Sequence, residues 1–401
     1  MKILIADKFQ EQGIENLRAA GCDVVFLPDT NKEQMQNAIG EHSPNVLIVR
    51  GTKVSGAAIA AGDKLGLIVR AGAGYDSIDV AEASRRGIYV ANCPGKNAVA
   101  VAELAWSLIL ACDRRVPDQT IQLRQKQWNK KDFAKAKGLK GRTLGVIGTG
   151  KIGMEVALRG MAFEMEVVAW SRSLDQAKAE SLGVGFCGSL SELASQSDVV
   201  SVNVAANAET ANLIDDAFIA NMKDGAYFIN TSRGSVVDSA ALSQGIREKG
   251  IRAGLDVFAN EPGSGVADFE DEIVTLPGVY GTHHVGASTD QAQAAIAEEA
   301  VRVITNFIAT GSVDNCVNLA TKTPAKCMLT VRHKNLPGVL AHVFEVIGEA
   351  KINVEEMENV IYDGAKAANA KIQLSDLLLS ENLDKIKTNQ NILSLELSKL
   401  D

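Results

Sequence analysis

The chain has 401 residues and a formal net charge of −8 at pH 7, with 46% hydrophobic and 22% charged residues. Its length exceeds what one ordinary core needs, so we expect two or three domains. The negative charge disfavours nonspecific binding to nucleic acid or anionic membranes, and no apolar run could span a bilayer. We expect a soluble, cytoplasmic protein that binds a small molecule.

The cysteines are scattered along the chain, without a CxxC pair and without a Cys/His spacing typical of a metal site. This pattern is typical of small buried thiols in a reducing compartment, and we expect no metal. The six cysteines are Cys22, Cys93, Cys112, Cys187, Cys316 and Cys327.

The first part of the chain alternates short apolar runs with amphipathic runs. Buried strands are predicted at 2–7, 23–28, 45–50, 65–72 and 87–93, and helices at 11–21, 31–42, 55–65 and 79–87. Strict alternation of strand and helix predicts a parallel sheet that is covered on both faces.

A long helix is predicted over 97–115, and it is too apolar to face solvent. We expect it to pack between domains or subunits, which favours a homodimer or homotetramer. A second alternating set follows. Its strands are predicted at 143–148, 166–171, 184–188, 198–204, 226–232, 251–258 and 279–286, and a helix follows at 289–311.

The pattern changes near Lys326 to strand, helix, strand, strand, helix, strand, which is the ferredoxin-like order. The predicted fold is therefore α/β, with two doubly wound parallel-sheet domains and a small C-terminal βαββαβ domain. We divide the chain into a discontinuous domain made of 1–96 with 286–322, a second domain at 97–285, and a C-terminal domain at 326–401.

A glycine motif of the form G-x-G-x-x-G comes directly after the predicted strand 143–148 and opens a helix. In this context the first glycine permits a tight turn, the second lets the backbone approach a pyrophosphate, and the third lets helix and strand pack closely. The motif predicts a dinucleotide site, with NAD as the expected cofactor. Its residues are Gly148, Gly150, Lys151, Ile152 and Gly153.

The end of the next strand leaves the choice between NAD and NADP open. NAD-binding units usually carry an acid there for the ribose 2′-hydroxyl, but this chain has Ser171 followed by Arg172. These two residues could accept the 2′-phosphate of NADP. Alternatively, Arg172 stacks on the adenine or lies in solvent, and NAD still binds.

Polar residues follow three successive strands of the second set. Arg233 follows the first, Asp256 and Glu261 the second, and His283 and His284 the third. Because the carboxyl ends of parallel strands meet at one edge of a sheet, we expect these side chains to gather in a ligand crevice.

The chain resembles the D-isomer-specific 2-hydroxyacid dehydrogenases through the stretches "GTGKIG", "NTSRG", "GLDVFANEP", "HHVGAST" and "NCPGKNAVAVAEL". The tail "RHKNLPGVL" resembles serine-responsive ACT domains, the small regulatory domains found in some members. For such members the resemblance implies oxidation of D-3-phosphoglycerate to 3-phosphohydroxypyruvate, the first step of serine biosynthesis.

The resemblance implies that 1–96 with 286–322 is a substrate-binding domain, 97–285 a dinucleotide-binding domain, and 326–401 a regulatory domain. It also implies roles for single residues. Arg233 holds the substrate carboxylate, His284 is the acid/base and Glu261 orients it, although His283 replaces the family's usual proline and leaves open which imidazole faces the substrate. These roles fit the chemistry, because an imidazole titrates near neutrality and a guanidinium grips a carboxylate with two hydrogen bonds. Cofactor contacts are implied for Thr231, Ser232 and Asp256. Substrate contacts are implied for Arg50, Lys53, Arg70, Gly72, Ala73, Gly74 and Asn97.

In the tail, His333 and Asn335 lie where the resemblance places an amino-acid effector, L-serine. Alternatively, this domain only mediates oligomerisation. Two other functions remain open for the whole chain. One is a glyoxylate or hydroxypyruvate reductase, and the other is a non-catalytic, nucleotide-sensing binding protein of the corepressor type.

Overall fold

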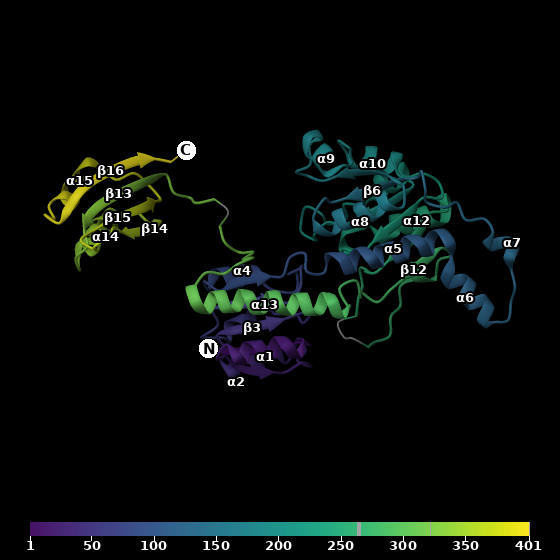
Figure 1. Ribbon diagram of the computed structural model, residues 1–401, viewed down its shortest axis with the longest axis horizontal. Coiled ribbons are helices and arrows are strands. Elements are labelled where there is room, and N and C mark those ends of the chain that lie inside the picture. Colours follow the sequence, from purple (N-terminus) through teal and green to yellow (C-terminus); the bar gives the residue numbers. More distant parts are fainter. Residues whose placement is uncertain (263–265, 321, 401) are drawn as a thin grey trace. The chain divides into compact units, whose positions relative to one another are not determined.

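The computed structural model describes residues 1–262, 266–320 and 322–400. The chain divides into two compact units, Met1–Asn318 and Leu319–Asp401. Figure 1 labels the elements of both. No helix in the described ranges is long and apolar enough to cross a bilayer.

The first unit contains two parallel sheets, as the sequence predicted. The N-terminal sheet has five strands in the order β2-β1-β3-β4-β5. Their bounds are Asp23–Phe26, Lys2–Ile5, Val46–Val49, Leu67–Arg70 and Tyr89–Asn92, and the helices between them are α1 (Glu11–Ala19), α2 (Met35–His42), α3 (Gly56–Ala60) and α4 (Val80–Arg85). The order reverses between β1 and β3, where a doubly wound sheet opens a crevice.

The second sheet has seven parallel strands in the order β12-β11-β10-β9-β6-β7-β8. In that order they are Val279–Gly281, Arg252–Leu255, Tyr227–Asn230, Val199–Val202, Thr143–Ile147, Glu166–Trp170 and Gly185–Phe186. The strand order reverses between β6 and β9, as in dinucleotide-binding sheets.

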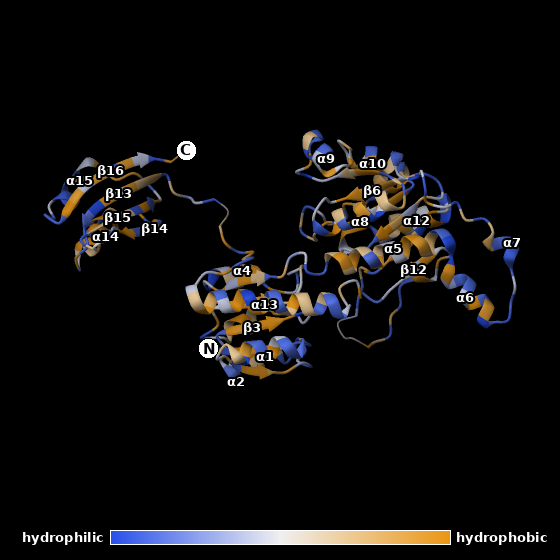
Figure 2. Cartoon of the chain, viewed as in Figure 1, coloured by the Kyte–Doolittle hydropathy of each residue, from blue (hydrophilic) through white to orange (hydrophobic). Residues whose placement is uncertain are grey.

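The helices of this region cover the second sheet or extend from it. They are α5 (Ala98–Arg114), α6 (Val116–Arg124), α7 (Lys130–Phe133), α8 (Lys151–Ala162), α9 (Gln176–Leu182), α10 (Leu190–Gln196), α11 (Asp216–Asn221) and α12 (Ser239–Lys249), with short 3-10 turns at Gly234–Val236 and Glu272–Thr275. Figure 2 shows that the central strands are largely hydrophobic, as expected for a sheet buried on both faces.

Helix α5 is covered within the first unit. Trp106 is 4% exposed, stacks on Phe163 with ring centroids 4.5 Å apart, and donates from Nε1 to the Val156 carbonyl at 3.1 Å. The sequence predicted that this apolar helix packs between domains or subunits. Because its own sheet and α8 already bury it, its apolar character is no evidence for an oligomer.

The chain crosses between the two sheets twice. It leaves β5 through residues 93–97, and it returns after β12 through α13 (Asp290–Thr310). Figure 1 shows α13 lying with the N-terminal elements, and its Ile296, Ala300 and Ile304 belong to the core of the first sheet. The division at 96/97 and 285/286 stays a prediction.

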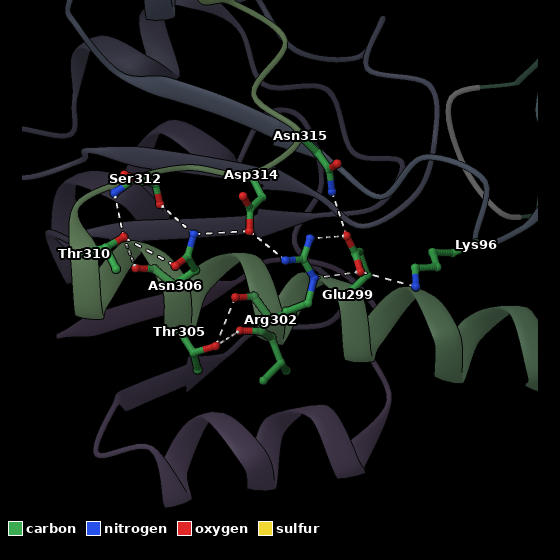
Figure 3. Close-up of polar contacts among 10 residues, drawn as sticks. Lys96, Glu299, Arg302, Thr305, Asn306, Thr310, Ser312, Asp314 and Asn315 are labelled. Atoms are coloured by element: carbon green, nitrogen blue, oxygen red, sulfur yellow. Dashed lines mark hydrogen bonds and ion pairs between the residues drawn. The ribbon is translucent and has the colours of Figure 1, made fainter.

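A buried carboxylate on α13 ties these crossings together (Figure 3). Glu299 is 7% exposed and receives two hydrogen bonds from Arg302, at 3.1 and 2.7 Å, and one from Asn315 at 2.7 Å. Lys96, in the first crossing, lies 3.3 Å from the same carboxylate. Arg302 in turn bonds Asp314 at 2.6 Å. Glu299 is thus the centre of the network that anchors the residue next to Asn97.

We expect Glu299→Gln to lower the free energy of unfolding by about 2 kcal/mol, because it removes a buried carboxylate that pairs with the partly exposed side chains of Arg302 and Lys96. The hydrogen bond from Arg302 is the main cause that lowers the pKa of Glu299 from 4.5 to about 2. Because the pKa of Glu299 is depressed in the folded state, ionised Glu299 stabilises the fold fully above pH 4.5. This stabilisation is lost as the pH falls towards 2.

Urea unfolding at pH 7 and at pH 3 measures the loss of stability in Glu299→Gln and its dependence on pH. The matched control is Glu298→Gln, because Glu298 is exposed and has no polar partner among the described residues; it should change stability by no more than about 0.5 kcal/mol. Equal effects of the two substitutions would contradict the role given to Glu299.

The second unit has the βαββαβ order that the sequence predicted. Its elements are β13 (Cys327–Lys334), α14 (Val339–Glu349), β14 (Val354–Ile361), β15 (Ala367–Leu374), α15 (Ser380–Lys387) and β16 (Ile392–Lys399). The strands form one antiparallel sheet in the order β14-β15-β13-β16, and both helices pack on it through a separate core. The predicted fold class is therefore confirmed.

Candidate active site

The loop after β12 carries an imidazole paired with a carboxylate. Nδ1 of His284 lies 2.6 Å from Oε2 of Glu261, whose Oε1 accepts from the Phe258 amide at 2.9 Å. Partial burial raises the pKa of Glu261, but the bonds from His284 and Phe258 outweigh it, and the net pKa lies below the usual value. An ionised carboxylate at Nδ1 fixes the tautomer and leaves Nε2 for a ligand.

The neighbouring His283 is exposed and has no polar partner among the described residues. Of the two adjacent histidines, only His284 is joined to Glu261. This contact bears directly on the alternative that the sequence left open, and it favours His284 as the acid/base.

Asp256 holds the loop that carries His284, and its contact with the cofactor stays a prediction. It is 1% exposed, and its carboxylate accepts from the Thr282 hydroxyl at 2.6 Å and from the amides of Val285 and Gly286, both at 2.9 Å. Its carbonyl accepts from the His284 amide at 2.8 Å. Because both carboxylate oxygens are engaged, Asp256 shapes the loop around His284, whose φ of 53° is unusual for a non-glycine residue.

Arg233, in the loop after β10, faces the loop after β4. Its Nε and Nη2 donate to the two carboxylate oxygens of Asp76, at 3.1 and 3.0 Å, and its Nη1 donates to the Ser232 carbonyl at 2.8 Å. Its charge also helps to lower the pKa of Glu261, so the guanidinium lies in the electrostatic neighbourhood of the His284–Glu261 pair. The structure thus brings the three predicted catalytic residues together.

Two further arginines come from the first sheet. Arg70 ends β4. Its side chain makes no hydrogen bond with any described residue, and its Nε is buried. Burial, together with the charges of Arg233 and Arg50, lowers the pKa of Arg70 to about 10. A buried N–H of a cation that lacks a partner destabilises the fold, and a bound anion would supply that partner.

Arg50 follows β3 and donates from Nη2 to the Ser288 hydroxyl at 3.1 Å. Its loop is shaped by Asp7, which accepts from the amides of Arg50, Gly51 and Thr52 at 2.7 to 3.1 Å. Lys53 is exposed and has no polar contact within the described ranges. Arg50 and Arg70 therefore share the crevice, whereas no contact joins Lys53 to it.

The glycines of the loop after β4 make room for guanidinium groups. A Cβ at Gly72 would lie 1.6 Å from Nη1 of Arg70, and one at Gly74 would lie 2.1 Å from Nη2 of Arg233. The sequence predicted that the amides of Gly72 to Gly74 hold the substrate carboxylate. The Gly72 amide already donates to the Arg70 carbonyl at 2.8 Å, so only those of Ala73 and Gly74 lack a partner among the described residues.

The glycine motif joins β6 to α8 as predicted. Gly148 has φ of 93°, and a Cβ at Gly153 would lie 1.9 Å from the Gly148 carbonyl oxygen, so both positions require glycine. A Cβ at Gly150 would meet nothing within 4 Å, and no side chain caps the helix there. Lys151, the next residue, reaches the Pro94 carbonyl at 3.3 Å, whereas Ile152 is half-buried.

Three buried oxygen atoms around this motif and crevice have no hydrogen-bond partner among the described residues. They are Oδ1 of Asn97, Oδ1 of Asn203 and Oγ1 of Thr231. Ser232, by contrast, donates from its hydroxyl to Oδ1 of Asn230 at 2.8 Å. Buried polar atoms without partners are uncommon and indicate a site completed by a ligand.

Ser171 and Arg172 follow β7, where the cofactor ribose is expected. Ser171 is half-buried, and Arg172 forms an exposed ion pair with Glu209. Arg172 is thus paired with a carboxylate from the loop after β9.

Comparisons with known proteins agree with this geometry. The family described as "D-isomer specific 2-hydroxyacid dehydrogenase, NAD binding domain" matches residues 106–286. A D-3-phosphoglycerate dehydrogenase of Methanocaldococcus jannaschii is 34% identical over 99% of this chain and 76% of its own length. The chain belongs to the D-isomer-specific 2-hydroxyacid dehydrogenases.

Two more members of this dehydrogenase family are informative. A hydroxypyruvate reductase of Thermotoga maritima is 42% identical over 68% of this chain and 87% of its own length. The NAD⁺-bound 3-phosphoglycerate dehydrogenase of Entamoeba histolytica matches 80% of this chain and 99% of its own, with a TM-score of 0.66 and 25% identity. Several other curated relatives are longer, and the chain spans only 57 to 60% of their length.

The residues of this dehydrogenase fit NAD. Gly150 leaves open space at the start of α8, where free amides and the helix dipole favour a pyrophosphate, and the unpartnered oxygens of Asn97 and Thr231 lie in buried positions near the crevice. When bound, NAD accepts a hydride from the carbon that carries the substrate hydroxyl. The protein supplies the binding, the orientation and the acid/base group.

Sequence reasoning missed three residues that hold the site of this dehydrogenase in place. Asp76 pairs with Arg233, Asp7 shapes the Arg50 loop, and Asn230 accepts from the amide and hydroxyl of Ser232. Asp7 ends a predicted strand, Asp76 follows one, and Asn230 ends the observed β10 but lies inside the predicted strand 226–232, so only the first two carried a positional signal. The identity of each partner was not readable from the sequence.

Proposed function

We propose that this dehydrogenase oxidises D-3-phosphoglycerate to 3-phosphohydroxypyruvate with NAD, the first step of serine biosynthesis. The observation that carries the proposal is the half-buried Arg70, whose side chain has no hydrogen-bond partner among the described residues, beside Arg50 and Arg233. A substrate with both a carboxylate and a phosphate needs cations at both ends. The D-3-phosphoglycerate dehydrogenases among its relatives support the same substrate.

In this proposal, Arg233 binds the substrate carboxylate with the two N–H groups that remain free, while Arg70 and Arg50 bind the phosphate. His284 accepts the hydroxyl proton at Nε2, because Nδ1 is held by Glu261. Glu261 stabilises the imidazolium that forms, and the guanidinium of Arg233 polarises the developing carbonyl.

The test is an initial-rate assay of the full chain with D-3-phosphoglycerate and NAD, read as NADH absorbance. We expect saturable turnover, and higher kcat/KM than for D-glycerate, which lacks the phosphate. Absence of turnover with D-3-phosphoglycerate, when another 2-hydroxy acid is oxidised, would reject the proposed substrate.

A hydroxypyruvate reductase is the second candidate, favoured by the 42% identity to the Thermotoga maritima enzyme. The same assay run backwards separates the two, because a reductase should prefer hydroxypyruvate to its phosphorylated form. If no 2-hydroxy acid or 2-oxo acid reacts, the binding-protein alternative stands instead.

We propose that the enzyme binds NADP as well as NAD, through Arg172. Arg172→Ala should raise the Kd of NADP about tenfold and leave that of NAD unchanged, because one charge-assisted contact to the 2′-phosphate is lost. Glu209→Gln should lower the Kd of NADP, since it frees Arg172 from its ion pair. Calorimetric titration with both cofactors measures this, and an equal change for NAD and NADP would contradict it.

We propose that the C-terminal unit is an ACT domain that binds L-serine and lowers turnover. His333 is 2% exposed, with Nδ1 2.8 Å from the Lys334 carbonyl and Nε2 3.3 Å from Oδ1 of Asn359, and Asn335 donates to the Ala365 carbonyl at 3.0 Å. These bonds shape the loop before α14, so its backbone is the proposed ligand contact. Inhibition by L-serine but not by D-serine supports the proposal.

A homodimer or homotetramer in the cytoplasm also remains proposed. Its support is the apolar surface of α6 and the loop that follows, where Val116, Ile121, Leu123 and Trp128 are between 52 and 81% exposed. The six cysteines are free, which is consistent with a reducing compartment. Light scattering of the purified chain determines the oligomeric state.

A further inference from the structure

We propose that Asp76 is a positioning residue for the reaction, which holds one edge of the Arg233 guanidinium and thereby turns the other edge towards the substrate. The inference rests on the proposed function, because it assigns the free edge of Arg233 to the substrate carboxylate. Neither the glycine motif nor the three catalytic residues predicted from the sequence required a role for Asp76.

The hydrogen bonds of Arg233 define which edge is free. A guanidinium has five N–H groups. Asp76 accepts from one on Nε and one on Nη2, and the Ser232 carbonyl accepts from one on Nη1. One N–H therefore remains on Nη1 and one on Nη2, and the proposal assigns these two to the end-on edge of the fork. That pair has the geometry for a bidentate contact with a carboxylate.

The surrounding charges explain why a carboxylate is needed beside Arg233. Arg70 is close enough to both Arg233 and Arg50 for their charges to interact with its own, and like charges at this range repel. Asp76 opposes that repulsion, and its bonds from Arg233 outweigh burial and lower its own pKa, so it is ionised at neutral pH. Without it, Arg233 would be free to turn away from Arg70.

The backbone at Gly74 lies close to the Asp76–Arg233 pair. A Cβ at Gly74 would lie 2.1 Å from Nη2 of Arg233 and 3.0 Å from Oδ1 of Asp76. Asp76 follows β4 of the first sheet and Arg233 follows β10 of the second, so the contact also fixes Arg233 relative to the loop that carries Arg70. The side chains are 51% and 26% exposed, and pairs of this kind contribute only about 0 to 1 kcal/mol to stability.

The role of Asp76 is therefore separable from folding. Asp76→Asn should lower kcat/KM for D-3-phosphoglycerate by about 100-fold, because a small misplacement of a binding group is enough for such a loss. It should raise KM and lower kcat while the thermal midpoint stays nearly unchanged. Asp76→Glu, which keeps the charge, should recover part of the activity. Asp79→Asn is the matched control, since Asp79 lies in the same segment and only caps α4.

A double-substitution cycle with Arg233→Lys tests whether Asp76 acts through the guanidinium. Lysine has no fork to orient, so Asp76→Asn should cost less than about threefold in that background. Additive losses would overturn the proposal, as would an unchanged kcat/KM in Asp76→Asn. A lower KM in Asp76→Asn would also overturn it, because Asp76 would then compete with the substrate. Wild-type chain that is inactive with D-3-phosphoglycerate would instead reject the proposed function.

Discussion

Replacing His284 by asparagine is expected to lower kcat by about 100-fold or more, because the substrate hydroxyl then loses its general base. Asparagine keeps a polar group at Nδ1's position but cannot accept a proton at neutral pH. The substitution leaves Arg233, Arg70 and the glycine motif in place, so KM for D-3-phosphoglycerate should change much less than kcat. Steady-state kinetics with NAD at pH 7 to 9 measures both constants.

The adjacent His283 provides a matched control in the same loop. His283→Asn should change kcat by less than about threefold, because this side chain is exposed and has no polar partner in the described part of the chain. A loss at His283 as large as that at His284 would reassign the acid/base. Equal cofactor binding by both variants would show that the loop itself is intact.

Replacing Arg70 by glutamine is expected to lower kcat/KM for D-3-phosphoglycerate by about 100-fold, which corresponds to about 2.7 kcal/mol of lost binding to the phosphate. The same substitution should change kcat/KM for D-glycerate by less than about threefold, because the carboxylate is bound elsewhere. The difference between the two substrates is the readout, and it separates a phosphate contact from a general disturbance of the site.

Stability gives a second, independent measure for Arg70. Its side chain is half-buried and its buried Nε has no partner among the described residues, so Arg70→Gln should not lower the thermal midpoint and is expected to raise it. Lys53→Gln is the comparison, since Lys53 is exposed, and it should have a small effect on both substrates. Equal losses with D-3-phosphoglycerate and D-glycerate would place Arg70 at the carboxylate instead.

The fold could be predicted because its signals are local. Apolar runs of strand length alternate with amphipathic runs through the first 311 residues, and in a parallel sheet this alternation leaves little choice of architecture. The glycine motif is similarly local: Gly148, Gly150 and Gly153 lie within one turn between a strand and a helix. The order of predicted elements changes near Lys326, and this change indicated a separate C-terminal unit.

The contacts of the site were harder to predict from the sequence, because they join distant parts of the chain. Asp76 and Arg233 are 157 positions apart, and no spacing pattern connects them. Asp256 shows the same limit. It stands at a strand end, as a cofactor contact would, and the sequence did not reveal that its carboxylate also holds the loop after β12.

The sequence by itself determined the order of elements, the place of the dinucleotide motif, and the set of charged side chains at the strand ends, because each depends on residues that are neighbours along the chain. Only the tertiary structure decided that His284 rather than His283 meets Glu261, that α5 is covered by its own sheet, and that Asp76 holds Arg233. Those outcomes depend on which loops the two sheets bring together, and burial and hydrogen bonding there select partners that local pattern does not encode.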